Sequence, residues 1–332
     1  MDGVFFDKDV SIDILNPMKV GVIGYGNQGR AQALNLRDSG VNVVIGLRED
    51  SSSIENVIED GLEWVEISEA VRQSDIISIL IPDQLMSDVY DTSISRYLKP
   101  GKVLLFSHGY NITYKQITPP HFVDVVMVAP SGPGYAVRRE YVKGRGVPTL
   151  VAVKQDVTGK AKDIVLAYSK AIGGTRSCCF VSNFKEETET DLFGEQIVLT
   201  GIIPRIINES FNVLLEAGYS PVVSWFVSFY EVKQISDLLS TMSIDEFYKA
   251  VSDTAEYGGL SRSNKLISSE FKNEMKVALE SIQSGDFHKE WQEEAEHGYK
   301  ELNKLREELK ASPINDITRN MLNLINKNKN DS

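Results

Sequence analysis

The sequence predicts an α/β fold with a doubly wound parallel sheet, followed by an all-helical region. Two observations carry this prediction. Short apolar stretches alternate with helix-compatible stretches from Met18 to Ile172, a pattern typical of parallel sheets with crossover helices. Strand signals stop after Val181, and the rest of the chain has helical periodicity. We therefore expect two domains, at residues 1–182 and 183–328.

Composition restricts the possible partners. The chain has 332 residues, 42% hydrophobic and 25% charged, and a net charge of −12 argues against nucleic acid or an anionic membrane surface as a partner. No apolar run is seen to approach the ~20 residues that span a bilayer, and no signal-peptide pattern begins the chain. The adjacent Cys178 and Cys179 are unsuited to pairing with each other. We expect a cytoplasmic protein that acts on a small molecule.

A glycine-rich turn follows the first clear strand. The apolar stretch from Met18 runs into a G-x-G-x-x-G motif at Gly24–Gly29, and a helix-compatible run (Arg30–Ser39) and a second strand (Val41–Leu47) come next. Glycines at these positions permit a tight turn and let backbone N–H groups approach a pyrophosphate at the helix N-terminus. In this strand–turn–helix–strand setting, the motif predicts a Rossmann-type dinucleotide-binding domain.

The end of the second strand indicates which dinucleotide binds. NAD-binding proteins usually place an Asp or Glu there to hold the ribose diol, whereas this chain has Arg48 followed by hydroxyls at Ser51–Ser53. A guanidinium with nearby hydroxyls suits a 2′-phosphate, so NADPH is favoured. A solvated loop arginine in an NAD enzyme stays open as the alternative.

Later strands deliver further polar residues. A buried strand (Asp75–Pro82) leads into Asp83–Met86, the strand Lys102–Ser107 delivers His108, and the strand Val125–Ala129 delivers the segment Pro130–Gly134. Ligands in such sheets bind at the carboxyl ends of the strands, so these segments should converge on the cofactor. A histidine at a strand end is a candidate catalytic residue, with a structural role as the alternative.

The acidic segment Lys185–Gln196 begins the helical half. Asn183 followed by Glu186 is typical of a helix N-terminus. On that helix Glu187, Asp191 and Glu195 are spaced four residues apart, which places three carboxylates on one face. From these residues alone, a solvated acidic face and a divalent-cation site both remain open.

The remaining helices are predicted from periodicity. A long helix from Asn183 to about Gly218 is expected to kink or divide at Pro204, and a second, from Ser220 to about Ser240, contains Glu231 as its likelier functional charge. The segment Ser252–Gly258 is interpreted as a polar junction. Further helices are expected at Ser268–Ser284 and Asp286–Leu309, with a frayed tail at Asn326–Ser332.

Motifs of specific spacing extend from Gly3 to at least Leu305. They include V-I-G-Y-G-N-Q-G at 22–29, H-G-Y-N-I at 108–112, V-R-R-E at 137–140, F-K-E-E-T-E-T-D-L-F-G-E-Q at 184–196 and S-D-T-A-E-Y-G at 252–258. Together they resemble the ketol-acid reductoisomerases (acetohydroxy acid isomeroreductases) of branched-chain amino acid synthesis, in their shorter form. This resemblance favours the cation site over the solvated acidic face.

The resemblance implies a two-step reaction on 2-acetolactate or 2-aceto-2-hydroxybutyrate: Mg²⁺-dependent alkyl migration, then reduction by NADPH. It also implies a knotted helical domain that pairs between subunits, and hence a homodimer or larger assembly. Carried over by position, Asp191, Glu195 and Glu231 would bind Mg²⁺, Ser252 would contact the substrate carboxylate, and His108 would be catalytic. The implied cofactor-binding residues are Tyr25, Gly26, Asn27, Gln28, Arg48, Ser51, Ser53, Asp83, Gln84, Leu85, Met86 and Gly134.

Three positions depart from the family pattern. The family has a second metal-binding Glu where this chain has Val227, a Lys beside the metals where it has Ser131, and often a His where it has Tyr230. The site therefore loses one negative and one positive side chain. The missing Glu ligand should weaken binding of the second Mg²⁺. Two alternatives therefore stay open: an NADPH-dependent 2-keto acid reductase that has lost isomerisation, and a non-catalytic protein that pairs with an active paralogue.

Overall fold

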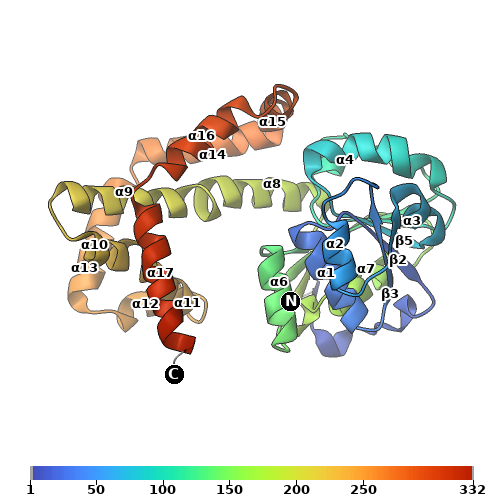
Figure 1. Cartoon of the computed structure of the whole chain (residues 1–332), viewed down its shortest axis with the longest axis horizontal. Coiled ribbons are helices and arrows are strands. Elements are labelled where there is room, and N and C mark those ends of the chain that lie inside the picture. The colour runs from blue at the N-terminus through green and yellow to red at the C-terminus, as the bar shows by residue number, and fades with distance from the viewer. Residues whose placement is uncertain (1–2, 331–332) are drawn as a thin grey trace. The chain divides into compact units, whose positions relative to one another are not determined.

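The computed structural model describes residues 3–330, with side chains described as far as residue 327. The chain divides into two compact units, Met1–Thr190 and Asp191–Ser332 (Figure 1). The division falls within helix α8 (Phe184–Gly194), so this single helix contributes residues to both units.

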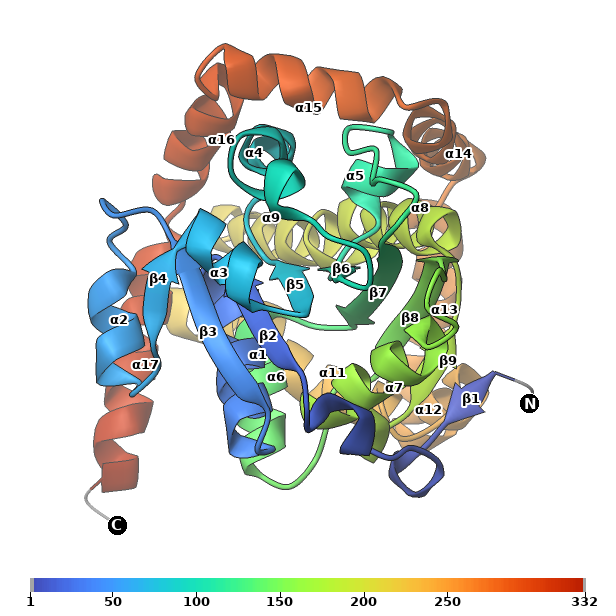
Figure 2. The same cartoon turned by 90° about the vertical axis from the view of Figure 1, so that its right-hand side faces the viewer.

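The first unit is built on a nine-stranded sheet with the order β1-β9-β8-β7-β6-β5-β2-β3-β4 (Figure 2). Strands β4-β3-β2-β5-β6-β7 are parallel and have the doubly wound Rossmann order, which confirms the predicted fold class. The added β8 runs antiparallel to β7, and the edge strand β1 runs antiparallel to β9. The strands are β1 (Val4–Phe5), β2 (Lys19–Ile23), β3 (Asn42–Leu47), β4 (Trp64–Glu66), β5 (Ile76–Ile79), β6 (Val103–Phe106), β7 (Asp124–Pro130), β8 (Thr149–Gln155) and β9 (Cys179–Val181).

Helices cover both faces of this sheet, and successive strand residues point to opposite faces. In β6, for example, Val103 and Leu105 join one buried cluster with residues of α1 and α7, whereas Leu104 and Phe106 join the other. Burial on both faces explains why these strands are continuous apolar runs in the sequence. The helices of the first unit are α1 (Asn27–Asp38), α2 (Ile54–Glu59), α3 (Ile67–Gln73), α4 (Asp83–Val89), α5 (Tyr110–Thr113), α6 (Gly134–Val142) and α7 (Ala161–Ala171).

The second unit is all-helical as predicted, but several boundaries differ from those expected. The long helix divides at Thr200–Gly201, before Pro204, after a π-helical turn (Glu195–Leu199). A second π turn, Phe226–Tyr230, interrupts the next helical segment. The helices here are α9 (Ile202–Glu216), α10 (Pro221–Trp225), α11 (Val232–Leu239), α12 (Ile244–Ala250), α13 (Asp253–Leu266), α14 (Ser269–Ser284), α15 (Asp286–Glu296), α16 (Lys300–Lys310) and α17 (Ile314–Asn330).

Three further expectations for this unit are corrected. The segment Ser252–Gly258 is no junction: Ser252 Oγ accepts the Ala255 N–H and caps the start of α13. The single helix expected at Asp286–Leu309 is divided into α15 and α16, because Gly298 and Tyr299 adopt left-handed φ values of 77° and 60°. The tail expected to fray from Asn326 is helical to Asn330, and its last two residues lie outside the described range.

One helical run, Phe184–Glu216, has the length and composition to cross a membrane, with a mean hydropathy of 1.3 over its apolar window. This corrects the expectation that no run approaches that length. Only 6% of the window is buried within the described structure. At its start, Phe184 lies in the core of the first unit and Glu187 is buried, so this end of the run is fixed by protein contacts.

Candidate functional site

The glycine-rich turn at the end of β2 has the geometry that a dinucleotide requires. Gly24 has a φ of +96°, and a Cβ there would lie 2.7 Å from the carbonyl oxygen of Leu80. A Cβ on Gly29 would lie 2.4 Å from the carbonyl oxygen of Gly24. Gly26, the residue before α1, has nothing within 4 Å of a Cβ position, so open space lies over the helix N-terminus. The turn therefore leaves room for a phosphate group.

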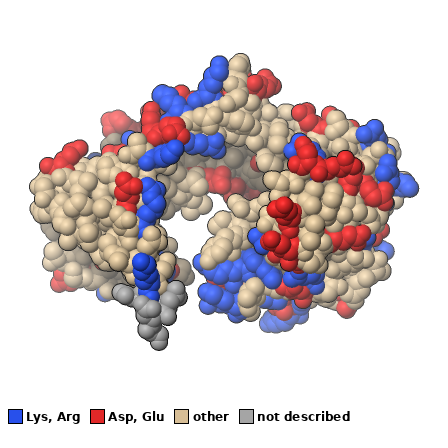
Figure 3. Space-filling view, viewed as in Figure 1, with Lys and Arg blue, Asp and Glu red and all other residues tan. Residues whose placement is uncertain are grey.

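The start of α6 packs directly against the start of α1. A Cβ on Gly134 would lie 2.0 Å from the carbonyl oxygen of Asn27, and Gln28 Nε2 donates to the carbonyl of Gly132 at 2.9 Å. Gly134 is thus needed for backbone packing, a role distinct from the cofactor contact predicted for it. A pocket of about 640 Å³ lies here, lined in part by Tyr25, Gly26, Asn27 and Gly134. Basic side chains gather on the surface around α6 (Figure 3).

Hydrogen bonds hold the Tyr25 side chain in this region. Its hydroxyl donates to Asp60 Oδ2 at 2.8 Å, and Arg30 makes a two-pronged pair with the same carboxylate at 2.7 and 2.9 Å. These hydrogen bonds, chiefly the one from Arg30, hold the pKa of Asp60 below its ordinary value. The network fixes the end of α2 against α1, and so supports one wall of the pocket.

Three predicted cofactor residues lie in the turn after β3. The backbone N–H of Ser51 donates to the carbonyl of Arg48 at 3.0 Å, and Ser51 Oγ accepts the N–H of Ser53 at 3.3 Å. Arg48 is highly exposed, 3.6 Å from the exposed Asp50. A surface ion pair of this length is weak. The guanidinium can therefore turn toward a 2′-phosphate.

Asp83–Met86 form the first turn of α4, beyond the end of β5. Asn111 Nδ2 donates to the Asp83 carboxylate at 3.3 Å and to the Asp83 carbonyl at 3.2 Å. Met86 is buried in the core, Gln84 is half-buried and Leu85 is exposed. The segment is thus held against α5, at the same edge of the sheet as His108.

His108 lies at the end of β6 and is held by a residue that sequence reasoning did not assign to the site. Glu187 is only 2% exposed; its Oε1 lies 2.9 Å from His108 Nδ1, and its Oε2 accepts the Gly109 N–H at 2.7 Å. A Cβ on Gly109 would lie 2.5 Å from the Phe184 carbonyl oxygen, so only glycine lets α8 approach this closely. The sequence feature that could have indicated a role for Glu187 is its place on the same helix face as Asp191 and Glu195.

Asp191 follows Glu187 by one turn of α8. One ligand atom from each of His108, Glu187 and Asp191 lies within 4.8 Å of the others. Carboxylate oxygens are the donors that Mg²⁺ prefers. Of the three predicted ligands Asp191, Glu195 and Glu231, only Asp191 belongs to this group. Both oxygens of Glu187 already contact His108 and Gly109. Glu195 comes one turn later, where α8 passes into the π turn Glu195–Leu199. Asp191 and Glu195 are both exposed to solvent.

The other two predicted ligand residues belong to later helices of the second unit. Glu231 is exposed and directly follows the π turn Phe226–Tyr230, and Ser252 is the exposed N-cap of α13. Neither belongs to the group formed by His108, Glu187 and Asp191. π turns are frequent at functional sites, and both turns of the second unit adjoin a predicted metal ligand.

Two of the positions that depart from the family pattern, Val227 and Ser131, are exposed to solvent. Val227 lies within the π turn Phe226–Tyr230, one turn before Glu231, and is 54% exposed. Ser131 is exposed in the loop after β7, where its backbone N–H donates to the Pro148 carbonyl at 2.8 Å. Longer charged side chains at these positions would have space, so the substitutions are not forced by packing.

A Rossmann sheet with an open glycine turn, beside a histidine–carboxylate cluster, defines a dinucleotide-dependent oxidoreductase. Two family models together cover most of the chain: the NADPH-binding domain of acetohydroxy acid isomeroreductase matches residues 14–178, and the C-terminal domain of ketol-acid reductoisomerase matches residues 184–327. The chain belongs to the ketol-acid reductoisomerase family.

Individual relatives agree with the family match. The chain is 49% identical over 316 residues to a ketol-acid reductoisomerase (NADP(+)) from Pyrococcus abyssi, covering 95% of each chain. Its structure is similar to an NADH-preferring ketol-acid reductoisomerase from an uncultured archaeon, with a TM-score of 0.94, 40% identity and coverage of 97% and 98%. A semialdehyde dehydrogenase NAD-binding protein from Cupriavidus necator, at 17% identity, a TM-score of 0.63 and coverage of 80% and 99%, shares the fold alone.

Proposed function

We propose that this protein is a ketol-acid reductoisomerase that converts 2-acetolactate or 2-aceto-2-hydroxybutyrate into the corresponding 2,3-dihydroxy acid, in valine and isoleucine synthesis. One observation carries the proposal: the match to the family is continuous, covering both domains and 95% of a relative with this activity in its name. The position of His108 beside two carboxylates of α8 supports it.

NADPH and Mg²⁺ are the cofactors that these residues suit. The glycine turn and the start of α1 would hold the pyrophosphate, and Arg48 with Ser51 and Ser53 would hold the 2′-phosphate. Asp191 and Glu195 would bind Mg²⁺, and Glu231 would serve a second ion. When bound, Mg²⁺ stabilises negative charge on the substrate oxygens and NADPH supplies hydride.

The chain's own groups orient the substrate and handle protons. A proton on His108 Nδ1, donated to Glu187, leaves Nε2 able to accept a proton from the substrate hydroxyl or return one to it. Glu187 fixes this orientation, because both of its oxygens are already used by His108 and by the backbone of Gly109. Ser252 would bind the substrate carboxylate.

The assay that tests this proposal follows NADPH oxidation at 340 nm with Mg²⁺ and compares two substrates. Turnover of both 2-acetolactate and the rearranged 3-hydroxy-3-methyl-2-oxobutyrate is expected. Turnover of the rearranged ketone alone would contradict the proposal, because it would mean that alkyl migration is lost at a site with Val227 and Ser131. In that case, Val227→Glu combined with Ser131→Lys should restore migration if only these groups are missing.

We further propose that the working form is a homodimer or larger homo-oligomer, paired through the helical unit. The support is physical: α9, α10 and the following π turn expose apolar side chains that include Ile206, Val213, Val222, Val223 and Phe226. A second copy of the chain would cover this surface. The free thiols of Cys178 and Cys179 suit a reducing, cytoplasmic environment.

A further inference from the structure

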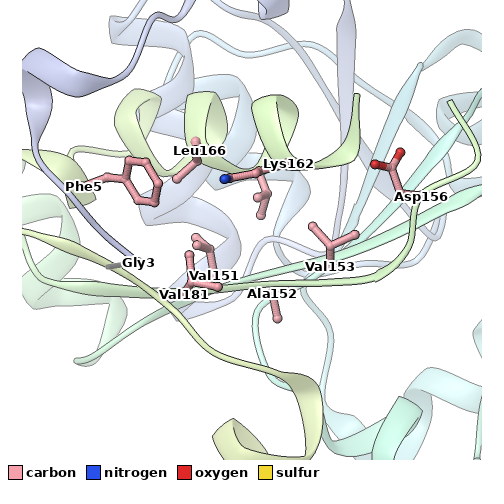
Figure 4. A pocket seen from close by; sticks show the side chains of 10 residues that line it. Gly3, Phe5, Val151, Ala152, Val153, Asp156, Lys162, Leu166 and Val181 are labelled. Atoms are coloured by element: carbon pink, nitrogen blue, oxygen red, sulfur yellow. The ribbon is translucent and has the colours of Figure 1, made fainter. Parts of the chain in front are cut away.

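A second pocket lies in the first unit, between α7 and the strands β8, β9 and β1. Its volume is about 390 Å³ (Figure 4). Because β8 is antiparallel to β7, Gln155 at the end of β8 pairs with Val125 near the start of β7. The pocket extends to Asp156, so it reaches the edge of the sheet opposite to the strand ends that deliver His108 and Ser131. None of the residues proposed for the active site lines it.

The walls of this pocket are aliphatic. Figure 4 shows Val151, Val153 and Val181 on the strand side, with Leu166 and Phe5 across from them. Val151 is buried, but Val153 and Val181 are 40% and 51% exposed. Branched side chains that line a concave, partly open space are typical of sites for small apolar groups.

One basic side chain, that of Lys162, lies beside these apolar walls. Lys162, in the first turn of α7, places its Nζ 5.5 Å from the centre of the Phe5 ring. Within the part of the chain that the structure describes, no carboxylate forms an ion pair with Lys162. The nearby acidic residue, Asp156, is used otherwise: its Oδ1 accepts the Ala161 N–H at 3.2 Å at the start of α7.

We propose that this pocket binds a small aliphatic monocarboxylate, with its carboxylate on Lys162 and its branched hydrocarbon chain against Val151, Val153 and Val181. An ammonium beside an apolar wall complements this chemistry, since it supplies charge at one end of the ligand and dispersion contacts along the rest. The volume of about 390 Å³ lies at the lower end of the range for small-molecule sites. The inference concerns a site apart from the catalytic edge and does not depend on the proposed reaction.

Three sources share this chemistry: a short branched fatty acid, a 2-oxo acid and an amino acid. Isotope-labelled valine and leucine methyl groups in the full-length protein, observed by NMR, would report binding and its location. The probes are 3-methylbutanoate, 3-methyl-2-oxobutanoate and L-valine, with 3-methylbutanamide as an uncharged control. We expect saturable shifts at Val151, Val153 and Val181 with at least one of the carboxylates, and the most effective probe identifies the source.

Two lysines provide a matched pair of variants. Lys162→Met should weaken carboxylate binding about tenfold, the scale of one charge-assisted hydrogen bond, and leave the binding of the amide unchanged. Lys154→Met, on β8 but outside the pocket lining, should leave both unchanged. Val181→Phe should block the site sterically and provides a second test. Shifts confined to other methyl groups, no saturable binding by any carboxylate, or equal binding by Lys162→Met and the unmodified protein would overturn the proposal.

Discussion

The nucleotide-binding unit buries most of its large apolar side chains within its own fold, whereas the helical unit leaves many of its apolar side chains exposed. Two large buried clusters cover the two faces of the sheet in the first unit. In the described part of the second unit, the buried apolar side chains are Leu192, Phe211, Trp225, Ile282 and Ile314. A unit of that length would ordinarily bury far more of its surface. The first unit therefore has a large core of its own, whereas the second leaves apolar surface that a second copy of the chain would cover in the proposed assembly.

The same contrast applies to the residues proposed for the site in each unit. In the first unit, the glycine turn, the β3 turn and His108 are each positioned by hydrogen bonds and close backbone contacts. In the second, Glu231 and Ser252 are exposed and adjoin helix ends.

The largest effect is expected at Asp191. Asp191→Asn removes a carboxylate that would bind Mg²⁺, and should lower kcat/KM for 2-acetolactate by about 10³. NADPH binding, measured by fluorescence titration, should remain, because the residues proposed to bind it all lie in the first unit. Asp237→Asn, on the exposed surface of α11, is the control and should be neutral. Equal loss in both variants would mean that the site has been misplaced.

Glu187→Gln should have the next largest effect. The amide can still contact the Gly109 N–H, but it no longer fixes the His108 ring as a charged acceptor. Loss of such a supporting contact typically costs about 10- to 100-fold in activity. The readout that separates positioning from simple damage is the split between kcat and KM: kcat should fall while KM for NADPH stays unchanged. An unchanged kcat would remove Glu187 from the mechanism.

Two equally exposed residues, one in each unit, allow the proposed subunit interface to be tested. Val213 on α9 and Ile58 on α2 are both 61% exposed. Val213→Glu should disrupt pairing through the helical unit and shift the mass measured by light scattering toward that of one chain. Ile58→Glu should leave the mass unchanged. If both variants retain the assembly of the unmodified protein, the surface that includes Val213 is not the subunit interface.

A smaller effect is expected at Arg48. Arg48→Ala should raise KM for NADPH about tenfold, the scale of one charge-assisted contact to a phosphate, while KM for NADH stays nearly constant. The comparison of the two dinucleotides in one assay is the measurement. Parallel changes for both would favour a solvated loop arginine, the alternative left open by the sequence.

The smallest effect concerns the stability of the first unit. Arg30 lowers the folded pKa of Asp60, so the pair stabilises the fold above the ordinary pKa of 3.8, and this contribution is lost as pH falls through the lower folded value. Asp60→Asn should therefore lower the urea midpoint at pH 7, and its difference from the unmodified protein should narrow below pH 3.8. Asp88→Asn is the matched control. A difference that is independent of pH would rule out the ion pair as its source.

Local signals allowed much of this architecture to be predicted. The glycine turn, the strand ends and the start of α8 follow from neighbouring residues, and Asn183 indeed accepts the Glu186 N–H at 3.0 Å. The role of Glu187 could not be predicted, because its partners His108 and Gly109 are 79 and 78 residues away in sequence. The antiparallel β8 likewise depends on long-range pairing. The break between α15 and α16 did have a local signal, because Gly298 has a left-handed φ of 77° and ends α15 in the way that glycines commonly end helices. The left-handed φ of 60° at Tyr299 is the part that a tyrosine does not indicate.

The proposed reaction is tested by a Mg²⁺ titration of NADPH oxidation with 2-acetolactate, using the unmodified protein. We expect that turnover is absent without Mg²⁺, rises with its concentration, saturates, and yields the 2,3-dihydroxy acid, because Asp191 and Glu195 are proposed to hold a cation that alkyl migration requires. Absence of turnover with 2-acetolactate at saturating Mg²⁺, while the rearranged ketone is still reduced, would contradict it.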